Sequence, residues 1–169
     1  NFPARWGKGA KNVFSPAPSN YVGECPLSAP ESRALAAFTL RLRPDYTLSF
    51  HTKGEELFWH FHQPPVRLAR DFLFARALSR DSGYPLKEAP RSAGGYKDWC
   101  VETLHIPAIT VEVGSAALPH PIGEDVLPEL IERAGGLVQA ASYAYKELPW
   151  TKNSCGKPLN SPNAPKKGE

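Results

Sequence analysis

Two residues whose side chains can do acid–base or metal chemistry, His51 and Glu112, each stand at the downstream end of a short apolar segment. Residues 45–51 alternate apolar and polar side chains, and residues 109–114 are mostly β-branched with one acid, so both segments predict strands. A histidine can ligate zinc, and a nearby carboxylate can take a proton from water. A His or Glu at a strand end is more often hydrogen-bonded or solvated, so residue types alone leave both interpretations open.

The elements that must position these two residues alternate along the chain. Ser28 and Glu31 have capping-box spacing, and the apolar stripe Leu35, Phe38 and Leu42 predicts an amphipathic helix over 29–42. The other expected elements are strands at 45–51, 56–61 and 108–114, and helices at 64–79, 96–104 and 124–145, with inward stripes that include Leu68, Phe72 and Ala75 in the second helix and Leu127, Leu137 and Ala141 in the last. Strands separated by helices predict an α/β sheet covered on both faces.

Length and charge limit the range of functions. The chain has 169 residues and is 41% apolar, which predicts one domain over 1–150 followed by a proline-rich, flexible tail over 151–169. The tail holds four lysines and one glutamate, which account for the whole net charge of +3. A near-neutral body argues against a nucleic-acid partner, because nucleic-acid binding needs a clustered basic surface.

No apolar run is long enough to cross a bilayer, so we expect no membrane span in this chain. Cys25, Cys100 and Cys155 are odd in number and lack metal-type spacing, which favours free or buried thiols. Because the chain contains no methionine, we expect it to be a fragment or a processed product.

Five blocks of sequence, in order along the chain, resemble the zinc carboxypeptidase family. They are Asn-Phe-Pro at 1–3, Pro-Leu-Ser-Ala-Pro-Glu-Ser at 26–32, Ser-Phe-His-Thr-Lys-Gly-Glu at 49–55, Ser-Ala-Gly-Gly-Tyr-Lys-Asp-Trp at 92–99 and Thr-Val-Glu-Val-Gly at 110–114. The Gly-Tyr-Lys-Asp-Trp run is most similar to the bacterial γ-D-glutamyl-diaminopimelate peptidases, which cut the peptide stems of peptidoglycan. The resemblance implies the C-terminal part of an α/β/α sandwich with a mixed sheet.

The same resemblance implies one zinc ion, with His51 as a metal ligand and Glu112 as the general base that deprotonates a zinc-activated water. Lys97 and Tyr96 align with the substrate pocket, where a lysine would suit the carboxylate of diaminopimelate; the alternative for Lys97 is a solvated helix lysine. A substrate-capping tyrosine of the family aligns with Pro90, and Tyr84 or Tyr96 could take that role.

The family's other zinc ligands and its substrate-binding Arg and Asn would lie upstream of Asn1. We therefore expect a missing N-terminal half of the catalytic domain, an exposed strand edge that this half covers, and little or no activity of the chain alone. The alternatives are a non-catalytic muropeptide-binding remnant and a general metallocarboxypeptidase. Localisation stays open between the bacterial cytoplasm and the cell envelope.

Two further expectations concern aromatic and imidazole side chains. His60 and His62 would share one face of the 56–61 strand, where they could chelate a metal or simply face water. Trp59, Phe61 and Trp99 are expected in the core or in a cleft wall.

Overall fold

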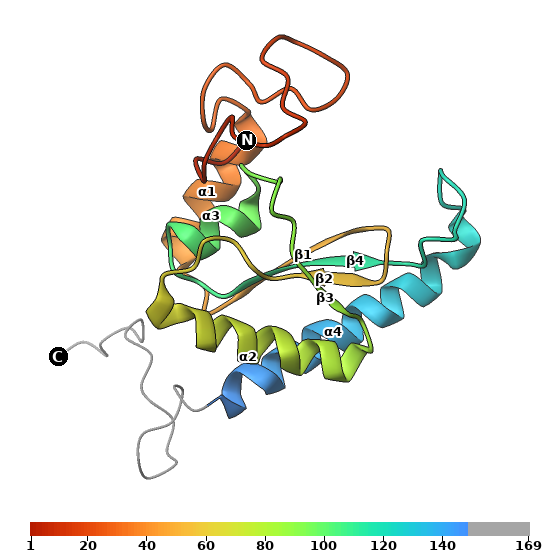
Figure 1. The fold of residues 1–169 in the computed structure, drawn as a ribbon. Helices are drawn as coiled ribbons and strands as arrows, with labels where there is room; N and C mark the ends of the chain where they lie inside the picture. Colours follow the sequence, from red (N-terminus) through yellow and green to blue (C-terminus); the bar gives the residue numbers. More distant parts are fainter. Residues whose placement is uncertain (149–169) are drawn as a thin grey trace, which may run out of the picture.

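The computed structural model describes residues 1–148 and contains a four-stranded mixed sheet (Figure 1). The elements are α1 (Pro30–Leu42), β1 (Thr47–Thr52), β2 (Glu56–Phe58), α2 (Pro65–Ser82), β3 (Leu86–Lys87), α3 (Tyr96–Glu102), β4 (Ala108–Val113), the short 3-10 helix η1 (Glu124–Val126) and α4 (Leu127–Glu147). The sheet order is β1-β4-β2-β3, with β1 parallel to β4 and β2 antiparallel to β4. The predicted α/β fold class with a mixed sheet is confirmed.

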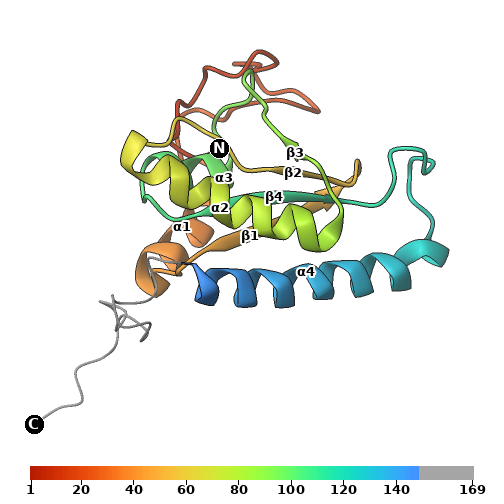
Figure 2. The ribbon, with the colours of Figure 1, turned by 60° about the horizontal axis from the view of Figure 1, so that its bottom comes forward.

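Helices cover both faces of this sheet, as Figures 1 and 2 show from two directions. Helices α2 and α4 pack against each other on one face, and α3 contacts β1 and β4 on the other, with α1 beside it. Side chains of β4 reach both faces of the sheet, because successive side chains of a strand point to opposite faces. Ile109, Val111 and Val113 enter the core with α2 and α4, whereas Thr110 and Glu112 face the cavity next to α3.

A second cluster of buried residues, besides the core between the sheet, α2 and α4, lies around α3. Phe2, Ala36, Phe61 and Trp99 are buried there, and the Phe2 and Trp99 rings stack with centroids 5.6 Å apart. The first residues of the chain are held in place by backbone hydrogen bonds, because the Phe2 amide donates to the Gly94 carbonyl at 2.9 Å. The expectation that Trp59, Phe61 and Trp99 are buried in the core or a cleft wall is confirmed.

Helix α1 forms over the expected residues, but its apolar stripe faces outward. Leu35, Phe38 and Leu42 are 39%, 49% and 57% exposed, and the buried members of α1 are Ala36 and Thr39. The capping box was also predicted wrongly: Ala29 is the N-cap residue, without a side-chain cap. The Asn1 side chain takes that place, since its Oδ1 accepts from the Ala29 amide at 3.1 Å and its Nδ2 donates to the Ser28 hydroxyl at 3.3 Å.

In α2 and α4, too, the buried face differs in part from the predicted apolar stripe. In α2, Leu68 and Phe72 are 40% and 39% exposed, whereas Ala75 is buried as expected. The buried face of α2 also holds Asp71, Phe74 and Leu78. Leu127 of α4 is exposed, while Leu137 and Ala141 are buried against the sheet as predicted. Helix α2 ends where Gly83 adopts a left-handed conformation, with φ of 76°.

Three further expectations concern the tail, the cysteines and membrane spans. The predicted tail over 151–169 and Cys155 lie outside residues 1–148. Cys25 is exposed, Cys100 is buried and both are free thiols. Among the helices of residues 1–148, none combines the length and apolar character needed to cross a membrane.

Candidate functional site

A cavity of about 490 Å³ opens beside the downstream ends of β1 and β4. Its ionisable lining side chains are those of His51, Glu112, Lys97 and Asp98, and Asn1 lines it as well. The remaining lining residues are Phe2, Ser49, Phe58, Ala89, Ser92, Gly94, Gly95, Tyr96 and Thr110. All four residues that the sequence singled out for the site, His51, Glu112, Lys97 and Tyr96, line this one cavity.

Strand pairing places His51 beside Glu112. The two residues are Cα partners in the parallel β1–β4 ladder, so their side chains leave the sheet on the same face. Glu56 of β2 is the antiparallel partner of Glu112 on the other side. Glu112 therefore stands between an imidazole and a second carboxylate.

The environment of Glu112 suits a group that exchanges protons. Burial raises the pKa of Glu112 above its ordinary value of 4.5; the His51 charge opposes this shift, and the Glu56 charge adds to it. A carboxylate with a raised pKa holds a proton more readily, which favours general base catalysis near neutral pH. Sequence reasoning missed Glu56, because only the antiparallel β2–β4 pairing brings it next to Glu112.

Lys97 is not the solvated helix lysine that the sequence left open as an alternative. Its Nζ lies 2.5 Å from Oδ1 of Asp98, and both side chains are almost fully buried, with 9% and 4% of their surface exposed. The same Nζ donates to the His60 carbonyl at 3.0 Å and lies 5.1 Å from the centre of the Phe61 ring. Asp98 also accepts from the Gly95 amide at 3.1 Å, so the charge of Lys97 is compensated inside the cavity wall.

Tyr96 contributes its ring to the cavity and its hydroxyl to a contact with α1. The hydroxyl lies 2.9 Å from Oγ1 of Thr39, which in turn donates to the Leu35 carbonyl. Burial raises the pKa of Tyr96 to about 12, although the Thr39 hydrogen bond opposes the shift. Tyr96 is therefore a neutral, fixed wall of the cavity. Tyr84, the other tyrosine considered, lines a different cavity.

The two other histidines considered as ligands, His60 and His62, lie beyond the end of β2. Strand β2 ends at Phe58, so His60 and His62 do not share a strand face as expected. His60 Nδ1 instead lies 3.9 Å from Oε2 of Glu88. Within residues 1–148, no group of three His, Cys, Asp or Glu side chains is arranged to hold a metal ion. The described residues thus supply one imidazole donor, His51, and do not form a complete zinc site by themselves.

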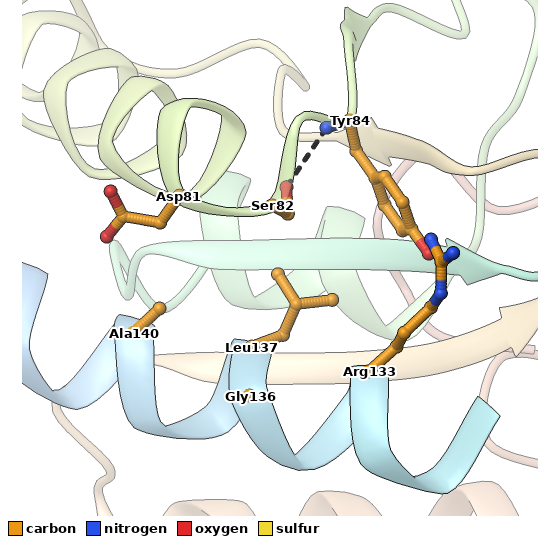
Figure 3. Close-up of a pocket in the computed structure, with 7 residues that line it drawn as sticks. All are labelled: Asp81, Ser82, Tyr84, Arg133, Gly136, Leu137 and Ala140. Carbon is orange, nitrogen blue, oxygen red and sulfur yellow. Dashed lines mark hydrogen bonds between the residues drawn. The ribbon is translucent and has the colours of Figure 1, made fainter. Parts of the chain in front are cut away.

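A second cavity, of about 260 Å³, lies between the end of α2 and the middle of α4 (Figure 3). Its lining residues are Asp81, Ser82, Tyr84, Arg133, Gly136, Leu137 and Ala140. The Arg133 guanidinium lies beside the Tyr84 hydroxyl. Its contacts with Tyr84 and Glu129 raise the pKa of Arg133. Arg133 also donates to Glu55 at 3.1 Å. Asp81 pairs with Arg80 and the Ser82 hydroxyl donates to the Leu78 carbonyl, so we assign the chemistry to the His51–Glu112 cavity.

Known proteins resemble this chain in sequence and in fold. The chain is 36% identical over 145 residues to γ-D-glutamyl-L-diamino acid endopeptidase 1 of Lysinibacillus sphaericus, a match that covers 84% of this chain and 35% of the relative. Bovine thrombin-activatable fibrinolysis inhibitor, solved with a tick carboxypeptidase inhibitor, superposes with a TM-score of 0.72 at 19% identity over 88% of this chain and 56% of that one. The fold of this chain is therefore carboxypeptidase-like, and its sequence is similar to that of a γ-D-glutamyl-L-diamino acid endopeptidase.

A third known protein with a similar fold is a bacterial enzyme. The murein-tripeptide amidase MpaA from Escherichia coli O157 superposes with a TM-score of 0.51 at 24% identity, over 88% of this chain and 57% of that chain. No family model matches the sequence. The chain spans about a third of the length of the curated relative and somewhat more than half of each solved chain.

Proposed function

We propose that the protein containing this chain is a zinc-dependent peptidase that hydrolyses peptidoglycan stem peptides at the γ-D-glutamyl-diaminopimelate bond. The observation that carries the proposal is the pairing of His51 with Glu112 across the β1–β4 ladder, at the edge of a cavity large enough for part of a peptide. The name of the Lysinibacillus sphaericus relative supports the substrate class.

His51 fits a zinc ion as one of its protein donors, and the other donors would come from outside residues 1–148. When bound, the ion would polarise the scissile carbonyl and make water a stronger acid. Glu112 takes a proton from the attacking water and then gives it to the leaving amine, a use that agrees with its raised pKa. Lys97 and Tyr96 shape the wall against which the substrate lies.

We further propose that the rest of the catalytic domain docks along β1. This strand lies at one edge of the sheet, and Phe50 on it is 39% exposed. The outward stripe of α1, formed by Leu35, Phe38 and Leu42, is exposed as well. An uncovered strand edge flanked by apolar side chains is unfavourable in water, and a segment paired with β1 could also bring donors next to His51.

Hydrolysis of a defined peptide by the full-length protein tests the proposal. Cleavage of L-Ala-γ-D-Glu-diaminopimelate should require zinc, and Glu112→Gln should lower kcat by about 10²–10⁴-fold because a general base is lost. Glu124→Gln is the matched control, since Glu124 is an exposed residue of η1 and does not line the cavity.

Two alternative functions predict different results in the same assay. A non-catalytic muropeptide-binding protein, which the incomplete donor set within residues 1–148 favours, would bind the peptide without cutting it. A general metallocarboxypeptidase would release C-terminal amino acids from ordinary peptides and leave the γ-glutamyl bond intact. Either result would replace the function proposed above.

A further inference from the structure

A third cavity adjoins the His51–Glu112 cavity. Its volume is about 640 Å³, and its walls come from the 9–12 turn, Asn20 and the 89–93 loop. Ala89 and Ser92 line both cavities, so the 89–93 loop separates them only in part. The Ala10 amide donates to the Arg91 carbonyl at 2.9 Å, which fixes the two walls relative to each other.

A smaller hollow of about 150 Å³ adjoins both cavities. It shares Asn12, Asn20 and Ala93 with the third cavity, and Asn1 and Gly94 with the His51–Glu112 cavity. All three hollows are lined in part by the 89–94 segment, so the third cavity lies next to the His51–Glu112 cavity along this segment.

The third cavity differs from the first in its free positive charge. Lys11 and Arg91 line it, both are exposed, and neither has an ion-pair partner among residues 1–148. In the first cavity, by contrast, the charge of Lys97 is compensated by Asp98 at 2.5 Å. The carboxamides of Asn12 and Asn20 add neutral donors beside Lys11 and Arg91.

We propose that this third cavity is a second substrate subsite, in which Lys11 and Arg91 bind a carboxylate of the peptide remote from the bond that is cut. The inference rests on the proposed peptidase function. A guanidinium binds a carboxylate through two parallel hydrogen bonds, and a lysine adds a mobile charge that adapts to the position of the ligand. Stem peptides carry several carboxylates, whereas the charge of Lys97 is already compensated by Asp98.

Calorimetric binding to the full-length protein carrying Glu112→Gln, which should bind peptide without cutting it, tests this subsite. The probes are the stem peptide L-Ala-γ-D-Glu-diaminopimelate and the same peptide with its carboxylates amidated. Adding Lys11→Gln and Arg91→Gln should raise the Kd for the acidic peptide about five- to ten-fold and that for the amide less than two-fold, since only the acidic peptide loses charged hydrogen bonds.

A matched pair of substitutions, Lys8→Gln and Arg43→Gln, removes the same charge from exposed residues that do not line the cavity. This control should change neither Kd by as much as two-fold. Equal losses in the control, or equal losses for the acidic and amidated peptides, would overturn the subsite. Unchanged binding of the acidic peptide would overturn it while leaving the peptidase proposal intact, whereas absence of both binding and cleavage in the parent protein would overturn both.

Discussion

Replacing Lys97 by methionine should destabilise the protein, because it leaves a carboxylate buried without its cation. Only 4% of the Asp98 side chain is exposed, and its Oδ1 lies 2.5 Å from Nζ of Lys97. Removing one partner of a buried ion pair costs about 3–5 kcal/mol. The Gly95 amide still donates to Asp98 in the variant, so we expect a loss near the lower end, about 3 kcal/mol.

The free energy of unfolding in urea, followed by circular dichroism, measures this loss. The double variant Lys97→Met/Asp98→Asn should recover about half of it or more, since the remaining amide is neutral. Arg80→Gln provides a surface control: this side chain is 77% exposed in its pair with Asp81, and its loss should cost less than about 1 kcal/mol. The reasoning is refuted if Lys97→Met costs less than about 1 kcal/mol, or if the double variant loses the sum of both single losses.

Three further predictions concern titration and metal binding. Glu56→Gln should shift the acidic limb of the kcat/KM profile to lower pH, because the Glu56 charge raises the pKa of Glu112 and the base must be ionised; a shift to higher pH would contradict this placement. Burial raises the pKa of Asp71 above 3.8, so its contribution to stability is present below that pH and is lost as the pH rises. Asp71→Asn should therefore gain stability relative to the parent between pH 3.8 and neutrality, as measured by urea midpoints; an unchanged difference would argue against a raised pKa. Zinc titration of this chain alone should show no tight one-to-one site, since one donor does not hold a catalytic zinc; a tight site by calorimetry would refute that expectation.

Local sequence patterns predicted the positions of the helices and strands better than which face of each helix is buried. Helix α1 forms over nearly the expected residues, yet Leu35, Phe38 and Leu42 point outward. A periodic stripe identifies a helix because side chains three and four residues apart share a face, but it does not state what covers that face. The predicted capping box of α1 was wrong for a related reason. Asn1, which is distant in sequence, makes hydrogen bonds with the Ala29 amide and the Ser28 hydroxyl in place of a local capping box.

The sequence alone determined the family resemblance, the order of the elements and the placement of His51 and Glu112 at strand ends. These features depend on residue types and on spacing within short segments, which a linear pattern records. Their joint presence at one cavity followed from the resemblance and agrees with the structure.

Only the tertiary structure decided which groups act on those residues. Strand pairing set Glu56 beside Glu112, and packing of α3 against the 59–61 segment joined Lys97 to the His60 carbonyl. The fold also buries the Lys97–Asp98 pair, and it places Lys11 and Arg91, which have no ion-pair partner among residues 1–148, beside the neighbouring cavity. Burial, pKa and free charge depend on neighbours that are remote in sequence, so no local pattern could have fixed them.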